Sequence, residues 1–418
     1  MTSKRIPKTA SIQSSSKRSS KLAAPRIGLA LAGGGPLGAV YEIGALAALE
    51  ESIEGLDLNA ADIYVGISAG GIIAAGLANG ITAHEMCRMF VESDAGDDDT
   101  ALFKPETLLR PAWEEFSIRG AAFPILLASG LIHYVRRRGK ASVANSLERL
   151  KGALPTGLLS GAGIHEFMER AFSAPGMSND FRALKRRLII VATDLDTGES
   201  VRFGETGFDS VPISKAAQAS AAVPGLFPPV EINGRYYVDG VLRKTLHASV
   251  ALDDGANLLF CLNPIVPYNA RSRHAPGKLA QGGLLAVLSQ TLRSIIHSRV
   301  EIGMSNYAVT YPGSDILLIE PSQEDADMFF TNLFSYNSRR RMCESAYQNT
   351  RMMLWQRRNE IGPVLERHGL RLKLPVLRDS SLTLVRHSAA DMEDRFGLAS
   401  LSQVLDSLER HLKIAAGS

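Results

Sequence analysis

Two apolar segments of strand length are each followed at once by a glycine-containing turn and then by a helical pattern. Residues 26–32 precede the turn 33–38 and the helical pattern 39–52. Residues 61–67 run directly into a sequence of small residues, 69–79, that also reads as a helix. Strands that alternate with helices in this way are typical of parallel sheets covered by helices. The sequence therefore predicts an α/β protein.

Further strands support a three-layer α/β/α fold with a mostly parallel central sheet. Residues 187–193 are a buried strand, with 201–203 as the expected hairpin partner. Residues 258–262 form another apolar run of strand length, and 315–319 is a later strand-like segment. Because the intervening stretches are helical, we expect helices on both faces of the sheet.

The composition changes twice along the chain, and we predict three parts. Residues 1–25 are a basic, Ser-rich arm, expected to be disordered. Residues 26–265 form the α/β domain, and residues 266–418 form a mainly helical C-terminal extension. The last helical pattern, 398–413, carries five aliphatic residues on one face. Such a stripe packs on the body or joins two copies of the chain, so a homo-oligomer through the C-terminal helices is a candidate.

The formal net charge of +3 is confined to the amino end of the chain. The first 41 residues hold seven of the 46 basic residues and no acidic one, which leaves 39 basic against 43 acidic residues. A weakly acidic body argues against a nucleic acid partner, because phosphate binding needs a basic surface. We expect the basic arm to be attracted weakly to anionic membrane.

We expect neither a secretory signal nor a transmembrane helix, and therefore a cytoplasmic protein that is peripheral at a membrane. Residues 63–83 carry no charge, but five glycines interrupt them. The apolar segment 121–135 is interpreted as a core-covering helix, with a lipid-facing lid as the alternative. The three cysteines and nine histidines show no metal-ligand spacing, so we predict no metal.

The motif that carries chemistry is Gly66-Ile-Ser-Ala-Gly70, between a predicted strand and a predicted helix. A sharp strand-to-helix turn exposes the serine hydroxyl, and glycines two residues before and after it permit the crowding. The hydroxyl also lies at a helix N-terminus, where developing negative charge is favoured. This context predicts that Ser68 is a nucleophile.

The loop Gly33-Gly-Gly-Pro-Leu-Gly38 has two interpretations. Its backbone amides could bind the oxyanion of a tetrahedral intermediate. The same glycines also spell the dinucleotide fingerprint, which requires an acidic residue at the end of the second strand. Ser68 stands where that acid is expected, so we favour the oxyanion site and predict no cofactor.

A serine nucleophile needs a base, and the residues alone leave two arrangements open. One is a triad of Ser68 with Asp239 and His247. The other is a dyad, in which a carboxylate takes the serine proton directly; this requires a desolvated site that raises its basicity. Asp239 ends a short β-rich run before Gly240, where it could equally be a turn-forming residue.

The chain resembles the patatin-like phospholipases over residues 26–265, with several motifs in family order. The glycine loop, the nucleophile elbow and the Asp-Gly pair all match, and the segments 193–199 and 219–229 resemble connecting segments of such proteins. The resemblance implies a patatin-like fold and a Ser–Asp dyad without a catalytic histidine. Carried over by position, it implies the following roles: Ser68 as nucleophile, Asp239 as base, Gly33, Gly34 and Gly35 as oxyanion donors, and Gly38, Gly66, Gly70 and Gly240 as supporting glycines.

By this resemblance the protein is expected to be a lipid acyl hydrolase of phospholipase A or lipase type that works through an acyl-enzyme. A catalytically silent lipid-binding or scaffold homologue and an acyltransferase with the same dyad are the alternatives. Two positions depart from the family pattern. Leu37 replaces a basic residue, and Val241 replaces Gly or Ala, which could narrow the pocket.

Overall fold

The computed structural model describes residues 12–13, 25–92, 110–113, 155–272, 277–325 and 336–385, and the structural statements below refer to these residues. The apolar segment 121–135, the predicted helix 398–413 and nearly all of the basic arm lie outside the described residues.

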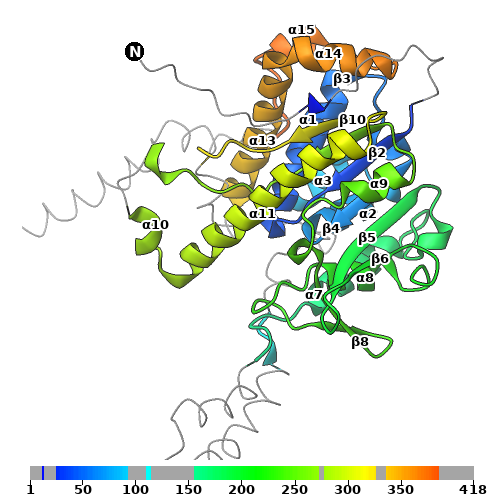
Figure 1. Ribbon diagram of the computed structural model, residues 1–418, viewed down its shortest axis with the longest axis vertical. Coiled ribbons are helices and arrows are strands. Elements are labelled where there is room, and N and C mark those ends of the chain that lie inside the picture. The colour runs from blue at the N-terminus through cyan, green and yellow to red at the C-terminus, as the bar shows by residue number, and fades with distance from the viewer. Residues whose placement is uncertain are drawn as a thin grey trace, which may run out of the picture.

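In the described chain, nine strands form the main sheet, shown in Figure 1. From one edge to the other the order is β1 (Ile12–Gln13), β10 (Asp315–Ile319), β9 (Leu258–Leu262), β2 (Ile27–Leu31), β4 (Ile63–Ile67), β5 (Arg187–Asp194), β8 (Arg235–Asp239) and β7 (Val230–Ile232), with β6 (Ser200–Phe203) paired to β5. The five strands from β10 to β5 are parallel to one another, and the other pairings are antiparallel. The prediction of a mostly parallel central sheet is confirmed, as is the hairpin of β5 and β6.

Helices surround this sheet. They are α1 (Gly35–Ser52), α2 (Ala69–Ala78), α3 (Ala83–Cys87), α7 (Ala162–Phe172), α8 (Ile213–Ser220), α9 (Ala248–Asp253), α10 (Lys278–Gln281), α11 (Gly283–Thr310), α13 (Tyr336–Gln356), α14 (Arg358–Arg367) and α15 (Leu374–Arg378). Short helical turns cover Leu58–Ala60, Arg88–Glu92, Phe181–Ala183, Gly240–Leu242 and Ala270–Ser272. Two further short strands, β3 (Ile53–Glu54) and β11 (Arg371–Leu372), pair antiparallel.

Both faces of the sheet are buried, which explains why its strands are continuously apolar. Successive side chains of a strand point to opposite faces. Leu29 and Leu31 accordingly join the hydrophobic cluster that contains α1, α2 and α13, whereas Ala30 joins the cluster that contains α9 and α11. Figure 1 shows α11 crossing in front of the sheet. Helices on both faces confirm the three-layer α/β/α prediction.

The described part of residues 266–418 is packed closely onto the rest of the chain. Strand β10 extends the sheet by parallel pairing with β9, and α13 runs along α1. At Gly44 a Cβ atom would overlap the carbonyl oxygen of Cys343, so only glycine permits this approach of the two helix backbones. The described residues after β9 therefore pack into the same hydrophobic core as the first strands.

The sequence predicts no transmembrane helix and no metal site. None of the helices described is both long and apolar enough for a membrane span. Within the same residues no cluster of three or more His, Cys, Asp or Glu side chains could hold a metal ion. None of the three cysteines, all of which lie in the described residues, forms a disulfide, and the sulfur atoms of Cys87 and Cys343 lie 3.9 Å apart between α3 and α13.

The contact of α1 with α13 predicts opposite effects for two glycine-to-alanine changes within helices. Gly44→Ala should lower the free energy of unfolding by about 1–3 kcal/mol, because its methyl group would collide with the α13 backbone. Gly303→Ala in α11 is the matched control, since its nearest neighbour would be 3.9 Å away. It should raise stability by up to about 1 kcal/mol through helix propensity. Urea unfolding measures both, and a neutral Gly44→Ala would contradict the α1–α13 packing.

Candidate active site

Ser68 lies in a strained turn between β4 and α2. Its φ of 54° is in the left-handed region, which residues with a side chain rarely adopt. The neighbouring glycines make this turn possible: a Cβ atom at Gly66 would lie 2.5 Å from the Cα of Gly71, and one at Gly70 would overlap the carbonyl oxygen of Ala32. Such strain, held by close packing, is common at functional sites. The geometry is that of a nucleophile elbow.

The glycine loop after β2 lies against the Ser68 side chain. A Cβ atom at Gly33 would be 3.0 Å from the Ser68 Cβ and 3.5 Å from its Oγ. Gly34 is the N-cap of α1. It packs tightly against Pro264, since a Cβ atom at position 34 would lie 2.9 Å from the Pro264 side chain. Gly35 begins α1 with a φ of 60°. Amides at the start of a helix have no acceptor within the helix, so they are available to an anion.

Asp239 is the last residue of β8, and it is 1% exposed. Its Oδ1 accepts a hydrogen bond of 2.9 Å from the amide of Val241, which fixes the carboxylate in the turn. Gly240 is required there, because a Cβ atom would overlap the carbonyl oxygen of Val191 in the neighbouring strand. Asp239 and Gly240 thus form a turn, as the turn-forming interpretation of this pair predicts. The same turn also places the Asp239 carboxylate at the candidate site.

The environment makes Asp239 a stronger base than an ordinary aspartate. Burial raises its pKa to about 6, against the opposing effects of the hydrogen bonds from Val241 and from the Ser68 side chain. Desolvation disfavours the charged form of a carboxyl group, which explains the direction. The structure therefore brings together Ser68 and Asp239, which are far apart in the sequence.

A further residue, Ser220 at the end of α8, holds the elbow in place. The Ser68 amide donates a hydrogen bond of 2.7 Å to the Ser220 Oγ, and that hydroxyl donates one of 2.6 Å to the carbonyl of Val191. All three groups are buried. Sequence reasoning did not assign Ser220 a role, although the segment 219–229 contains it.

His247, the histidine of the triad alternative, has a different environment. It is 2% exposed, and burial lowers the pKa of its imidazole to about 3. Within the described residues, no hydrogen bond joins it to Ser68 or Asp239, and its Nε2 has no partner. Its ring instead interacts with the backbone of Gly240.

The two departures from the family pattern are directed into apolar surroundings. Leu37 packs on the hydrophobic cluster that contains α1, and Val241 packs on the cluster that contains α9 and α11. Both side chains are thus partly buried against the core.

The site thus combines the buried serine hydroxyl of Ser68, the glycine-loop amides beside it, and the Asp239 carboxylate with its raised pKa. A model of the patatin-like phospholipase family matches residues 29–252, which is more than half of the chain. The chain belongs to the patatin-like phospholipase family. Membership in this family implies a lipid ester hydrolase. The fold is accordingly the patatin fold.

Solved structures give weak likenesses. VipD from Legionella pneumophila is 16% identical, over 85% of this chain and 72% of that chain, with a TM-score of 0.35. ExoU from Pseudomonas aeruginosa, in complex with SpcU, is 18% identical, over 68% of this chain and 53% of that one, with a TM-score of 0.28. A separate structure of the type III effector ExoU is 18% identical, over 92% and 70%, with a TM-score of 0.27. Likenesses this weak carry no argument about function.

The hydrogen bond from the Ser68 amide to the Ser220 hydroxyl predicts that removing this hydroxyl lowers both the stability of the protein and the reactivity of Ser68. Ser220→Ala should lower the free energy of unfolding by about 1–3 kcal/mol, because the buried Ser68 amide loses its acceptor. It should also slow the labelling of Ser68 by a fluorophosphonate about tenfold or more, since the elbow shifts.

Ser214→Ala is the matched control for Ser220→Ala. Ser214 is equally buried on the same helix and is hydrogen-bonded to His165 and Asn179, away from Ser68. Its loss should cost similar stability without changing the labelling rate. Equal labelling of both variants would contradict the role of Ser220.

Proposed function

We propose that this protein is a lipid acyl hydrolase, of phospholipase A or lipase type, that cleaves carboxylic esters through Ser68 and Asp239. The observation that carries the proposal is the direct interaction of the Ser68 side chain with a buried carboxylate whose pKa is raised. A carboxylate in such surroundings is matched to proton transfer near neutral pH.

The reaction follows from these positions. Asp239 accepts the Ser68 proton as Oγ attacks the ester carbonyl, which forms a tetrahedral oxyanion. Asp239 then gives the proton to the departing alcohol oxygen, leaving Ser68 acylated. In the second half, Asp239 takes a proton from water, the resulting hydroxide attacks the acyl group, and the proton returns to Ser68 as the fatty acid is released.

The oxyanion would be bound by amides of the glycine loop. Gly33 lies against Ser68, and Gly34 and Gly35 begin α1. Donors fixed by packing stabilise the transition state without reorganising during the reaction, and the positive end of the α1 dipole adds to them. Gly38, Gly66, Gly70 and Gly240 support this arrangement by letting backbones approach.

Two alternatives use the same residues and differ in outcome. An acyltransferase would pass the acyl group to an alcohol instead of water, which an acceptor alcohol that competes with water would reveal. A silent lipid-binding homologue would bind vesicles without releasing fatty acid. The intact Ser68–Asp239 arrangement favours the hydrolase over the silent homologue.

The dyad predicts the effect of three substitutions. Ser68→Ala and Asp239→Asn should each lower ester turnover by about 10³-fold or more, because nucleophile and base are lost. His247→Gln should retain most activity, since the imidazole forms no hydrogen bond with either group in the described residues. Fatty acid release from a mixed lipid panel is the measurement, with circular dichroism as the control for folding. A loss in His247→Gln as complete as in Ser68→Ala would establish a triad instead.

The raised pKa of Asp239 predicts the pH dependence. The base must be ionised, so kcat/KM should be full above the pKa and fall as the pH decreases through about 6. An aspartate with an ordinary pKa would keep its activity to about pH 4. Turnover of a soluble ester between pH 4 and 8 measures the midpoint, and a midpoint near 4 would contradict the desolvated base.

A further inference from the structure

We propose that the outer face of α11 and the basic pocket beside it form the surface on which this enzyme docks to anionic lipid membrane. This inference rests on the proposed function, because it supplies the route by which a lipid substrate reaches Ser68. It follows from an exposed apolar stripe, from a cluster of cations that form no ion pair with other described residues, and from the contacts of α11 with neighbouring segments.

Helix α11 is buried on one side and open on the other. Val300 and Met304 pack in the cluster on the sheet. On the outer face, Ile302 and Val309 are 59% and 82% exposed, and Leu284 at the N-terminal end is 73% exposed. The exposed apolar residues of the stripe are Leu284, Leu288, Leu292, Ile295, Ile302 and Val309. Most of them are spaced by four or seven residues, so they share one side of the helix.

Contiguous exposed apolar surface marks an interaction site, and its surroundings indicate the partner. Arg243, Lys244 and Arg299 line a cavity of about 440 Å³ at the side of α11, together with Tyr307 and Tyr311, and no carboxylate is among its lining residues. None of the three cations forms an ion pair within the residues that the structure describes.

Arg299 places positive charge within the apolar stripe itself. It lies between Ile295 and Ile302 on the exposed side of the helix. One of its amino groups donates to the carbonyl of Leu242 at 2.6 Å, and the residue as a whole is exposed. Apolar side chains with adjacent unpaired cations fit the acyl boundary and the phosphates of an anionic bilayer. A two-fold contact between copies would instead bring like charges together near its centre.

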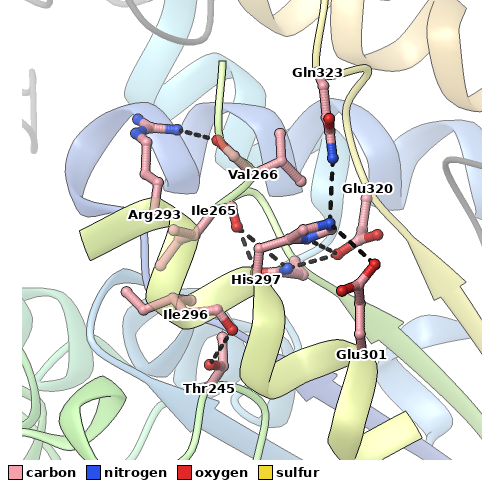
Figure 2. Close-up of polar contacts among 10 residues, drawn as sticks. Thr245, Ile265, Val266, Arg293, Ile296, His297, Glu301, Glu320 and Gln323 are labelled. Carbon is pink, nitrogen blue, oxygen red and sulfur yellow. Dashed lines mark hydrogen bonds and ion pairs between the residues drawn. The ribbon is translucent and has the colours of Figure 1, made fainter. Parts of the chain in front are cut away.

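Figure 2 shows that the inner edge of α11 contacts the chain segments that follow β8 and β9. Arg293 donates to the carbonyl of Val266 at 3.3 Å, and Thr245 donates to the carbonyl of Ile296 at 3.4 Å. Val266 follows Pro264, which contacts the oxyanion loop. A membrane bound to the outer face would therefore lie beside the turns that carry Asp239 and the glycine loop.

His297 also attaches α11 to the chain segments beside the sheet. Its Nδ1 lies 3.6 Å from the Oε1 of the buried Glu320, and its Nε2 lies 3.8 Å from Glu301 (Figure 2). Glu320 in turn accepts a hydrogen bond of 2.6 Å from Asn263, directly after β9. These contacts tie the middle of α11 to the carboxyl ends of β9 and β10.

Vesicle sedimentation tests the docking surface independently of turnover, if all proteins carry Ser68→Ala so that the lipids stay intact. The protein should bind vesicles of phosphatidylcholine mixed with phosphatidylserine more tightly than vesicles of phosphatidylcholine alone, and high salt should reduce the difference. Ile302→Asp and Lys244→Glu should each lower the partition coefficient on the mixed vesicles at least about fivefold. Met352→Asp on α13 and Lys185→Glu, both exposed, are the matched controls and should stay within about twofold.

Three further measurements fix the interpretation. Unchanged binding by both α11-side variants, with unfolding temperatures equal to the parent protein, would overturn the proposal. A molar mass in solution that halves in Ile302→Asp would also overturn it, because the face would then join two copies. The same variants with Ser68 restored should turn over a soluble ester at the parent rate. If the parent hydrolyses no ester while the vesicle results hold, the proposed function fails and the docking surface stands.

Discussion

The close approach of backbone to backbone at one edge of the sheet is the interaction on which the active site depends. The elbow after β4 touches the end of β2 at Gly70, the turn after β8 touches β5 at Gly240, and the glycine loop touches Ser68 at Gly33. A methyl group at Gly70 or Gly240 would separate the backbone segments, and one at Gly33 would press on the Ser68 side chain. Five parallel strands supply the frame, because their carboxyl ends all meet at this edge.

The same packing sets the chemistry, because it excludes water from the carboxylate. Asp239 lies under its own turn with a single backbone donor, and Ser68 is 3% exposed. In water, an aspartate is too weak a base to activate a serine hydroxyl. In the proposed mechanism, burial removes that limitation, so that no histidine is needed as the base. The imidazole of His247 is itself held neutral by burial. One physical cause, desolvation, thus raises one pKa and lowers the other.

Much of this could be predicted from the sequence, because local patterns determine it. The strand before Ser68, the turn after Asp239 and the alternation of strands and helices depend on neighbouring residues. Ser220 could not be found in this way, since its contact with Ser68 depends on how α8 meets β4 across the sheet. The packing of α13 on α1 through Gly44 is equally invisible, because one glycine among 37 gives no periodic signal. The contact of Val241 with the cluster of α9 and α11 is likewise a tertiary contact that its local sequence does not indicate.

A water-excluded site also limits how a lipid can reach it. An acyl chain that crossed bulk water to Ser68 would lose its favourable apolar surroundings before it gained those of the site. Contact between membrane and protein beside the site removes that intermediate step, so exposed apolar residues are expected near the catalytic turns. Helix α11 has this property: one side stabilises the sheet through Val300 and Met304, and the other leaves its aliphatic stripe open. An exposed apolar stripe would be unfavourable on an ordinary surface helix, but it is what the proposed action of a buried Ser68 on lipid requires.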